Sequence, residues 1–212
     1  MTAETIFLAR PNRETAFLYP GHAAWYKNAR PVFEKYHNVV DLDLPDIWVR
    51  DFLPLQNRTT GKLYQMFYNP IFRTELYKKS YAEIRDRVKK LFPNAEPLPV
   101  RMDGGNLITN GAMGMAFWNN MIGESKDNVA KILKDALGFA EFHWLPKLPG
   151  HLDAFCHIDG FANFINDRTI ITSLSANDER HDSRMKLYDQ KLKNSTLRTT
   201  ILRNIANGTT TP

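Results

Sequence analysis

The sequence predicts an α/β fold built from a repeated unit in which a strand, a β-hairpin and a helix follow one another. Short apolar runs joined by Gly- and Asn-rich turns are typical of hairpins, and longer runs with a period of about 3.6 residues are typical of helices. Acidic turns recur at Asp51, Asp103 and Asp159, which are 52 and 56 residues apart. A repeat of this length indicates one supersecondary unit. We therefore expect equivalent positions to lie close together, with hairpins inward and helices outward.

The order of apolar patterns in the sequence predicts the elements of the first unit. Its expected elements are, in chain order, a strand at 6–10, a helix at 23–36, a strand at 38–44 and hairpin strands at 52–55 and 63–68. A helix follows, with basic residues between its apolar positions, and Pro93 ends it. The apolar positions of that helix are Tyr77, Tyr81, Ile84, Val88 and Leu91.

The second and third units repeat this order. Their expected elements are a strand at 96–102, a hairpin of 107–109 and 113–118, a helix at 129–137, an extended run at 139–145, a hairpin of 161–165 and 169–174, and a helix at 179–193. Gly138 is expected to cap the helix before it, since glycine reaches the left-handed conformation without strain. We expect one domain over 1–193 and a polar tail over 194–212, in which only 200–205 has a strand pattern.

The composition is that of a globular protein and argues against a membrane protein. The chain has 212 residues, 43% of them hydrophobic, which is enough for one sizeable core. The net charge of +5 comes from dispersed basic residues, so a solvated basic face is favoured over a nucleic-acid site. No run is apolar and long enough for a membrane helix, and one cysteine cannot form an internal disulfide. We therefore expect no membrane partner and a cytoplasmic location.

The first acidic turn, Trp48-Val49-Arg50-Asp51, is expected to be extended. Residues two apart in a strand share a face, which groups Trp48 with Arg50 and Val49 with Asp51. A carboxylate that accepts two N–H bonds, beside an aromatic face that stacks on a cation, suits a planar guanidinium. The alternative is a structural ion pair between Arg50 and Asp51.

The other two turns carry chemistry of the same kind. In Asp103-Gly104-Gly105 the paired glycines allow close backbone approach and could deliver a carboxylate into a crowded site, although a plain tight turn is the alternative. His157 and Asp159 are expected on one face of a strand, where a histidine can move protons and an acid can hold a cation. The alternative for His157 is a buried core histidine. Acids gathered from the three turns would form a pocket for a planar cation.

Cys156 is the only thiol of the chain and precedes His157. Neighbours in a strand point to opposite faces, so Cys156 is expected to face away from His157 and Asp159 as a buried, inert thiol. The six histidines show no spacing with cysteine that is typical of a metal site, and the sequence has no Gly-rich phosphate loop. We therefore expect no metal site and no phosphate-binding loop.

In these three turns the sequence resembles the agmatine deiminase and bacterial peptidyl-arginine deiminase family, a part of the guanidine-modifying pentein superfamily. Trp48-Val49-Arg50-Asp51 is similar to the family's Trp-x-Arg-Asp motif, residues 103–106 to its acidic Gly-Gly motif, where Glu is frequent, and residues 157–159 to its His-x-Asp motif. The resemblance covers about residues 4 to 176. It implies a five-bladed α/β propeller with its active site on the axis, and hence a partial, pentein-like propeller for this chain.

The resemblance also implies roles for the site residues. Asp51 and Asp159 would bind the substrate guanidinium, Asp103 would be a further acidic contact, and His157 would be the general acid and base. The expected substrate-binding set is Trp48, Asp51, Asp103, Asn106 and Asp159, and the expected catalytic set is His157, Asp159 and Asp51. The family reaction is attack by a cysteine on the guanidine carbon, loss of ammonia and hydrolysis of a covalent thiouronium intermediate to a ureido product, without a cofactor.

The family nucleophile is a cysteine in a Gly-rich loop near the C-terminus, and no such loop occurs in these 212 residues. The leading interpretation is a protein that binds a guanidino ligand (agmatine, arginine or peptidyl-arginine) and hydrolyses it little or not at all on its own. It would be a truncated enzyme, a stand-alone protein without turnover, or a chain whose partner supplies the missing blades. Two further alternatives are a non-catalytic interaction protein that forms homo-oligomers through exposed sheet edges and a basic nucleic-acid binder.

Overall fold

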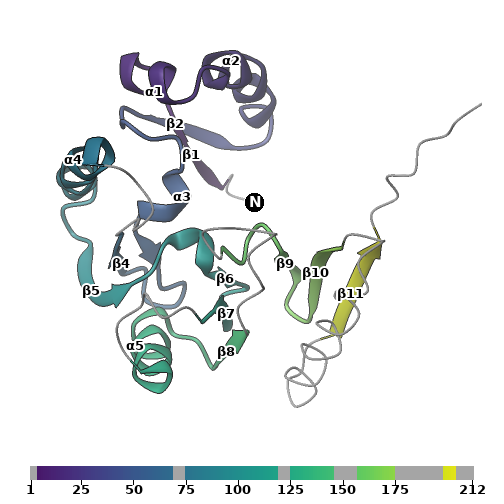
Figure 1. The fold of residues 1–212 in the computed structure, drawn as a ribbon. Coiled ribbons are helices and arrows are strands. Elements are labelled where there is room, and N and C mark those ends of the chain that lie inside the picture. Colours follow the sequence, from purple (N-terminus) through teal and green to yellow (C-terminus); the bar gives the residue numbers. More distant parts are fainter. Residues whose placement is uncertain (1–3, 69–74, 119–124, 146–156, 175–197, 204–212) are drawn as a thin grey trace, which may run out of the picture.

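The computed structural model describes residues 4–68, 75–118, 125–145, 157–174 and 198–203. Within these residues the strands form four sheets, and the labelled helices α1, α2, α4 and α5 lie on the periphery around them (Figure 1). The chain thus has the α/β fold that the sequence predicts. In the described part, no helix combines the length and the apolar character that crossing a membrane requires.

The N-terminal sheet consists of two parallel strands, β1 (Thr5–Ala9) and β2 (Asn38–Leu42), joined through α1 (Arg13–Leu18) and α2 (His22–Phe33). Parallel strands need a long crossover connection, which these helices supply. The apolar pattern did not predict α1. This helix begins at Asn12, whose side chain accepts from the Thr15 N–H at 2.9 Å while Thr15 Oγ1 accepts from the Asn12 N–H at 2.9 Å. Such a capping box starts a helix without any apolar periodicity.

The other three sheets share one strand order. In each, the middle strand pairs antiparallel with the strand before it and parallel with the strand after it. They are, in chain order, β3 (Leu55–Gln56), β4 (Leu63–Phe67) and β5 (Glu96–Arg101); β6 (Ile108–Thr109), β7 (Met113–Phe117) and β8 (Glu141–Leu145); and β9 (Ala162–Asn166), β10 (Thr169–Leu174) and β11 (Arg198–Arg203). Helices α4 (Glu75–Leu91) and α5 (Lys126–Leu137) connect the parallel pairs of the first two. Hairpins are present at the three predicted places, but the strand predicted at 52–55 is wrong in its bounds, since Phe52 ends the helix α3 (Val49–Phe52) and the strand is Leu55–Gln56. The propeller arrangement stays a prediction.

Helix α5 has the C-terminal end that its sequence predicts. Gly138 follows it with a φ of 76°, and its N–H donates to the Lys134 carbonyl at 2.9 Å. At the other end, the Ser125 hydroxyl accepts from the Asn128 N–H at 3.2 Å. A left-handed residue after the last turn favours glycine, so the predicted cap is confirmed.

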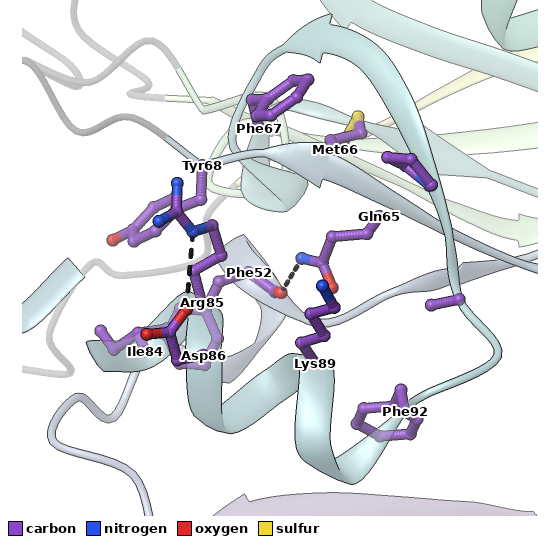
Figure 2. A pocket seen from close by; sticks show the side chains of 12 residues that line it. Phe52, Gln65, Met66, Phe67, Tyr68, Ile84, Arg85, Asp86, Lys89 and Phe92 are labelled. Carbon is purple, nitrogen blue, oxygen red and sulfur yellow. Dashed lines mark hydrogen bonds and ion pairs between the residues drawn. The ribbon is translucent and has the colours of Figure 1, made fainter. Parts of the chain in front are cut away.

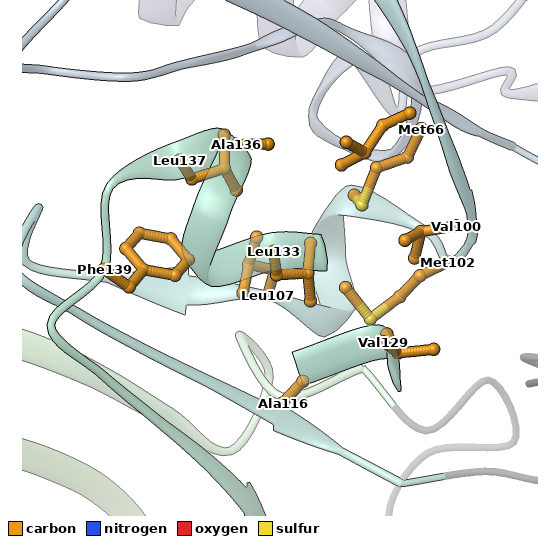
Figure 3. Packing of buried hydrophobic residues seen from close by; sticks show 11 residues of the cluster. Met66, Val100, Met102, Leu107, Ala116, Val129, Leu133, Ala136, Leu137 and Phe139 are labelled. Atoms are coloured by element: carbon orange, nitrogen blue, oxygen red, sulfur yellow. The ribbon is translucent and has the colours of Figure 1, made fainter. Parts of the chain in front are cut away.

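Three apolar clusters lie between neighbouring elements. The largest packs the buried face of α5 against strands β4, β5 and β7, and its members include Met66, Val100, Ala116, Val129 and Leu133 (Figure 3). A second joins β7 to the third hairpin through Met115, Phe117, Ile158, Phe161 and Ile170. A third packs α4 against β2 and the short helix α3 (Val49–Phe52) through Leu42, Leu44, Phe52, Ile84 and Val88. The first two clusters take residues from successive units and so fix the position of each acidic turn relative to the next, whereas the third lies within the first unit.

Two predicted segments differ from the structure. Residues 49–52, expected to be extended, form α3, so the alternation of side chains predicted for residues 48–51 is wrong. Residues 157–160 form a bend and turn ahead of β9, so a shared strand face is not what brings His157 and Asp159 together. In both places tertiary contacts override a local strand pattern, and the next subsection describes those contacts.

Some predictions fall on residues that the structure does not describe. The predicted helix at 179–193 and Cys156 both lie outside the described residues. Strand β11 lies within the segment predicted to be a polar tail and runs parallel to β10. The domain boundary at 193 stays a prediction.

Candidate functional site

Helix α3 and the 3₁₀ turn η1 (Gly104–Asn106) meet backbone to backbone. A Cβ atom at Gly104 would lie 1.9 Å from the carbonyl oxygen of Arg50, a separation that no side chain permits. The Gly105 N–H donates to Asp51 Oδ1 at 2.9 Å. The paired glycines therefore allow the close approach that the sequence predicts, and this contact fixes the carboxylate of Asp51.

The far side of α3 is held by β4. Gln65 Nε2 donates to the Phe52 carbonyl at 2.6 Å (Figure 2). Phe52 also lines a cavity of about 540 Å³ between α4 and β4, together with Met66, Tyr68 and Ile84. None of Asp51, Asp103 and Asp159 lines this cavity, so it is separate from the acidic turns.

The third acidic turn, residues 157–160, is fixed by a hydrogen bond to η1 and by the buried side chain of Ile158. The Asp159 N–H donates to the Gly105 carbonyl at 3.1 Å. Ile158 is fully buried in the second apolar cluster, and its carbonyl accepts from the N–H groups of Phe161 and Ala162. With Ile158 buried, the side chains on either side of it are directed toward Gly105.

Three functional side chains surround Gly105. A Cβ atom placed there would lie 2.6 Å from Asp51 Oδ1, 2.9 Å from His157 Nδ1 and 3.2 Å from Asp159 Oδ2. Asp103 joins the same group, because its Oδ2 lies 3.1 Å from His157 Nε2. The structure thus brings four of the sequence-predicted residues into one cluster, here called the acidic cluster: Asp51, Asp103, His157 and Asp159.

Asp51 is the most buried acid of the cluster. Its side chain is 8% exposed, and loss of solvent raises the pKa of Asp51 from an ordinary 3.8 to about 6. The neighbouring His157 and the Gly105 N–H lower this pKa, while the charges of Asp103 and Asp159 raise it. Desolvation dominates, so a cation bound beside Asp51 would stabilise its carboxylate.

His157 and Asp103 form a histidine–carboxylate pair at the edge of the cluster. When His157 Nε2 carries the proton it donates to Asp103, and Nδ1 then lies on the side of Asp51, 3.9 Å from Asp51 Oδ1. A carboxylate on one ring nitrogen orients the imidazole and stabilises its charged form. The pair is therefore suited to giving and taking a proton at a bound ligand.

Asp159 forms an ion pair with Arg50. Arg50 Nε lies 3.0 Å from Asp159 Oδ2, and Arg50 Nη2 donates to the Leu107 carbonyl at 2.8 Å. The sequence-based alternative, a local pair between Arg50 and Asp51, is therefore wrong. The partner of Arg50 is more than a hundred residues away along the chain, so no local pattern could have found it.

The remaining predicted ligands, Trp48 and Asn106, have other contacts. The Trp48 side chain is half exposed and packs edge-on against Tyr19 at a ring distance of 6.5 Å. Asn106 is buried, with its Nδ2 donating to the Phe117 carbonyl at 2.9 Å and its Oδ1 accepting from the Phe117 N–H at 3.0 Å. These bonds tie η1 to β7. The ligand roles of Trp48 and Asn106 stay predictions, and the geometry of Asn106 is that of a structural residue.

The side chains of the acidic cluster are not arranged as metal ligands in the described structure. Across the described ranges, no group of three or more His, Cys, Asp or Glu side chains is arranged to hold a metal ion. Among the described residues, the cationic partners of the cluster's acids are Arg50, which pairs with Asp159, and His157 when it is protonated, which pairs with Asp103 and Asp51. A cluster of acids with one histidine suits an organic cation.

Comparison with known proteins identifies the family. A family model described as Porphyromonas-type peptidyl-arginine deiminase matches residues 6–204. The chain belongs to this family. No curated protein sequence matches it significantly.

Solved structures of this family and its neighbours share the fold. An agmatine deiminase from C. jejuni has a TM-score of 0.68 at 17% identity, over 95% of this chain and 70% of that one. An agmatine deiminase of Enterococcus faecalis has a TM-score of 0.59 at 16% identity, over 95% and 68%. A dimethylarginine dimethylaminohydrolase from Pseudomonas aeruginosa, in complex with citrulline, has a TM-score of 0.55 at 12% identity, over 96% and 77%. At these identities the likeness is one of fold.

Proposed function

We propose that this member of the peptidyl-arginine deiminase family binds the guanidinium group of agmatine, arginine or a peptidyl-arginine at the acidic cluster. The observation that carries the proposal is the convergence of Asp51, His157 and Asp159 on Gly105, within 2.6 to 3.2 Å of a single point. A planar cation with N–H groups on several edges suits carboxylates that approach from different directions. The related C. jejuni enzyme with substrate bound supports the same class of ligand.

The electrostatics of Asp51 favour a cation in this position. Its carboxylate is desolvated and lies near two other acids, which raises its pKa to about 6. A guanidinium bound beside it supplies an opposite charge and so lowers the cost of ionisation. Asp51 and Asp159 would accept hydrogen bonds from the ligand, and the His157–Asp103 pair would move a proton.

Turnover through the reaction that the family resemblance implies needs a thiolate near the guanidine carbon. The chain contains one cysteine, Cys156, which lies outside the described residues. The proposal for these 212 residues is therefore ligand binding with little hydrolysis. Any further chain that carries a suitable cysteine would convert the same cluster into a hydrolytic site.

We expect the 212-residue protein to release little or no ammonia from agmatine, free arginine or an arginyl peptide. The measurement is a coupled ammonia assay, with Cys156→Ala as the matched variant. Equal background for both proteins is the expected result. Rapid release that disappears in Cys156→Ala would make Cys156 the nucleophile and would contradict its expected inert character.

The affinity for agmatine is expected to rise with pH, because the ligand binds best to ionised Asp51. With a pKa of about 6 for Asp51, we expect binding to weaken about tenfold between pH 7.5 and pH 5. Asp51→Asn should remove this step and weaken binding at pH 7.5 by about tenfold or more. Calorimetric titration across this pH range measures both effects, and the exposed Asp167→Asn is the control.

Asp51→Asn, which should weaken ligand binding, should increase the stability of the protein without ligand. The folded-state pKa of Asp51 lies above its unfolded value, so its contribution favours folding below pH 4 and is lost as the pH rises through about 6. Asp51→Asn should therefore stabilise the empty protein at pH 8, by about 1–3 kcal/mol. Urea unfolding at pH 8 and pH 4 tests this: a variant that is less stable than the parent at pH 8 would contradict the burial argument.

A further inference from the structure

Arg50 links all three acidic turns, and this inference about its role rests on the proposed function. Its backbone belongs to α3, its Nη2 donates to the carbonyl that follows η1, and its Nε pairs with the third turn at Asp159. The carbonyl that it reaches belongs to Leu107, which is 2% exposed. A buried carbonyl needs a donor, so the contact of Arg50 with Leu107 has a structural reason of its own.

The contact with Asp159 uses only part of that carboxylate. Arg50 approaches Asp159 Oδ2 through Nε at 3.0 Å, and its Nη2 is engaged elsewhere at 2.8 Å. A guanidinium is a rigid planar fork, so these two contacts together fix where Asp159 Oδ2 can lie. The same Oδ2 lies 3.2 Å from the point at Gly105 on which Asp51 and His157 converge, so Arg50 holds the oxygen that faces the proposed ligand position.

We infer that Arg50 is a positioning residue: it holds Asp159 Oδ2 where this oxygen, together with Asp51 and His157, faces the position proposed for the ligand guanidinium. The backbone of Arg50 is itself fixed, since its carbonyl lies against Gly104 and leaves no room for a Cβ atom. Arg50 also places a positive charge beside an acid whose own charge raises the pKa of Asp51. Arg50 therefore offsets part of the repulsion between Asp159 and Asp51.

A competing role for Arg50 makes the opposite prediction. If its guanidinium occupied the place of the ligand, removing it would open the site and strengthen binding. Its side chain is half exposed and its contacts in the described structure run to Asp159 and Leu107. A guanidinium that filled the ligand position would instead be expected at Asp51, the most buried acid of the cluster.

Agmatine binding by Arg50→Ala, Arg50→Lys and the control Arg85→Ala tests the inference by calorimetry at pH 8. We expect about a tenfold loss of affinity in Arg50→Ala, because Asp159 loses its fixed orientation. Lysine keeps the charge, but it lacks the planar guanidinium that contacts Asp159 Oδ2 and the Leu107 carbonyl together. We therefore expect a loss of affinity of about threefold in Arg50→Lys. Arg85 is 68% exposed and lies apart from the cluster, and its replacement should change affinity less than about twofold. Equal or tighter binding by Arg50→Ala overturns the inference.

A second measurement separates this inference from the proposed function. In a double-mutant cycle of Arg50→Ala and Asp159→Asn, the unfolding equilibrium constants of the empty protein should be coupled by about three- to fivefold. If the parent protein binds no agmatine, the proposed function fails, while the cycle still decides whether Arg50 holds Asp159. Strictly additive effects in the cycle overturn the positioning role even if agmatine binds.

Discussion

Gly104→Ala is expected to lower the free energy of unfolding by about 3 kcal/mol or more. The added methyl group would lie 1.9 Å from the Arg50 carbonyl oxygen and 3.0 Å from its carbonyl carbon. Both atoms belong to the backbone, so the clash cannot be relieved by a side-chain rotation. Separation of α3 from η1 would also weaken the hydrogen bond between the Gly105 N–H and Asp51.

Urea unfolding measures this effect, and Gly21→Ala is its matched control. Gly21 has no heavy atom within 4 Å of an added Cβ, so we expect a change below about 1 kcal/mol there. A Gly104→Ala protein as stable as the parent would mean that α3 and η1 do not meet as the structure describes.

Gly105→Ala is expected to weaken ligand binding by about a hundredfold. Its methyl group would occupy the point on which Asp51, His157 and Asp159 converge. The nearest atom is Asp51 Oδ1 at 2.6 Å, on a side chain that is almost fully buried and has little space in which to move. The obstacle consists of side-chain atoms, so the stability cost should be smaller than for Gly104→Ala.

The adjacent pair of variants therefore separates folding from binding. Calorimetry with agmatine should give near-complete loss for Gly105→Ala in a protein that still unfolds cooperatively. Full-strength binding by Gly105→Ala would remove Gly105 from the centre of the site. If Gly104→Ala and Gly105→Ala both unfold, a loss of binding by Gly105→Ala has no meaning. The binding measurement on Asp51→Asn then tests the site.

The acidic cluster could be predicted from sequence because it depends on a repeat. Equivalent turns of packed units lie close together whatever the local conformation of each turn. The expectation for Asp51, His157 and Asp159 therefore holds even though α3 is helical and residues 157–160 are a turn. The reason first given for it, strand alternation, is wrong, since four residues are too few to distinguish a strand from a helical turn.

Other features could not be predicted, for different physical reasons. The ion pair of Arg50 with Asp159 joins residues that only the packed units bring together. The burial of Asn106 follows from its bonds to Phe117, a tertiary contact with no signal in the local sequence. Helix α1, in contrast, carries a signal: Asn12 and Thr15 have the spacing of a capping box, which a reading limited to apolar periodicity overlooks.

Residue-resolved NMR during titration with agmatine tests the central claim most directly, with putrescine as the amine that lacks the guanidinium. The account predicts saturable shifts of the Gly105 and Asp159 amides and of the His157 ring with agmatine, and much smaller shifts with putrescine at the same concentration. Equal responses to both amines, or shifts confined to a distant element such as α5, would contradict it.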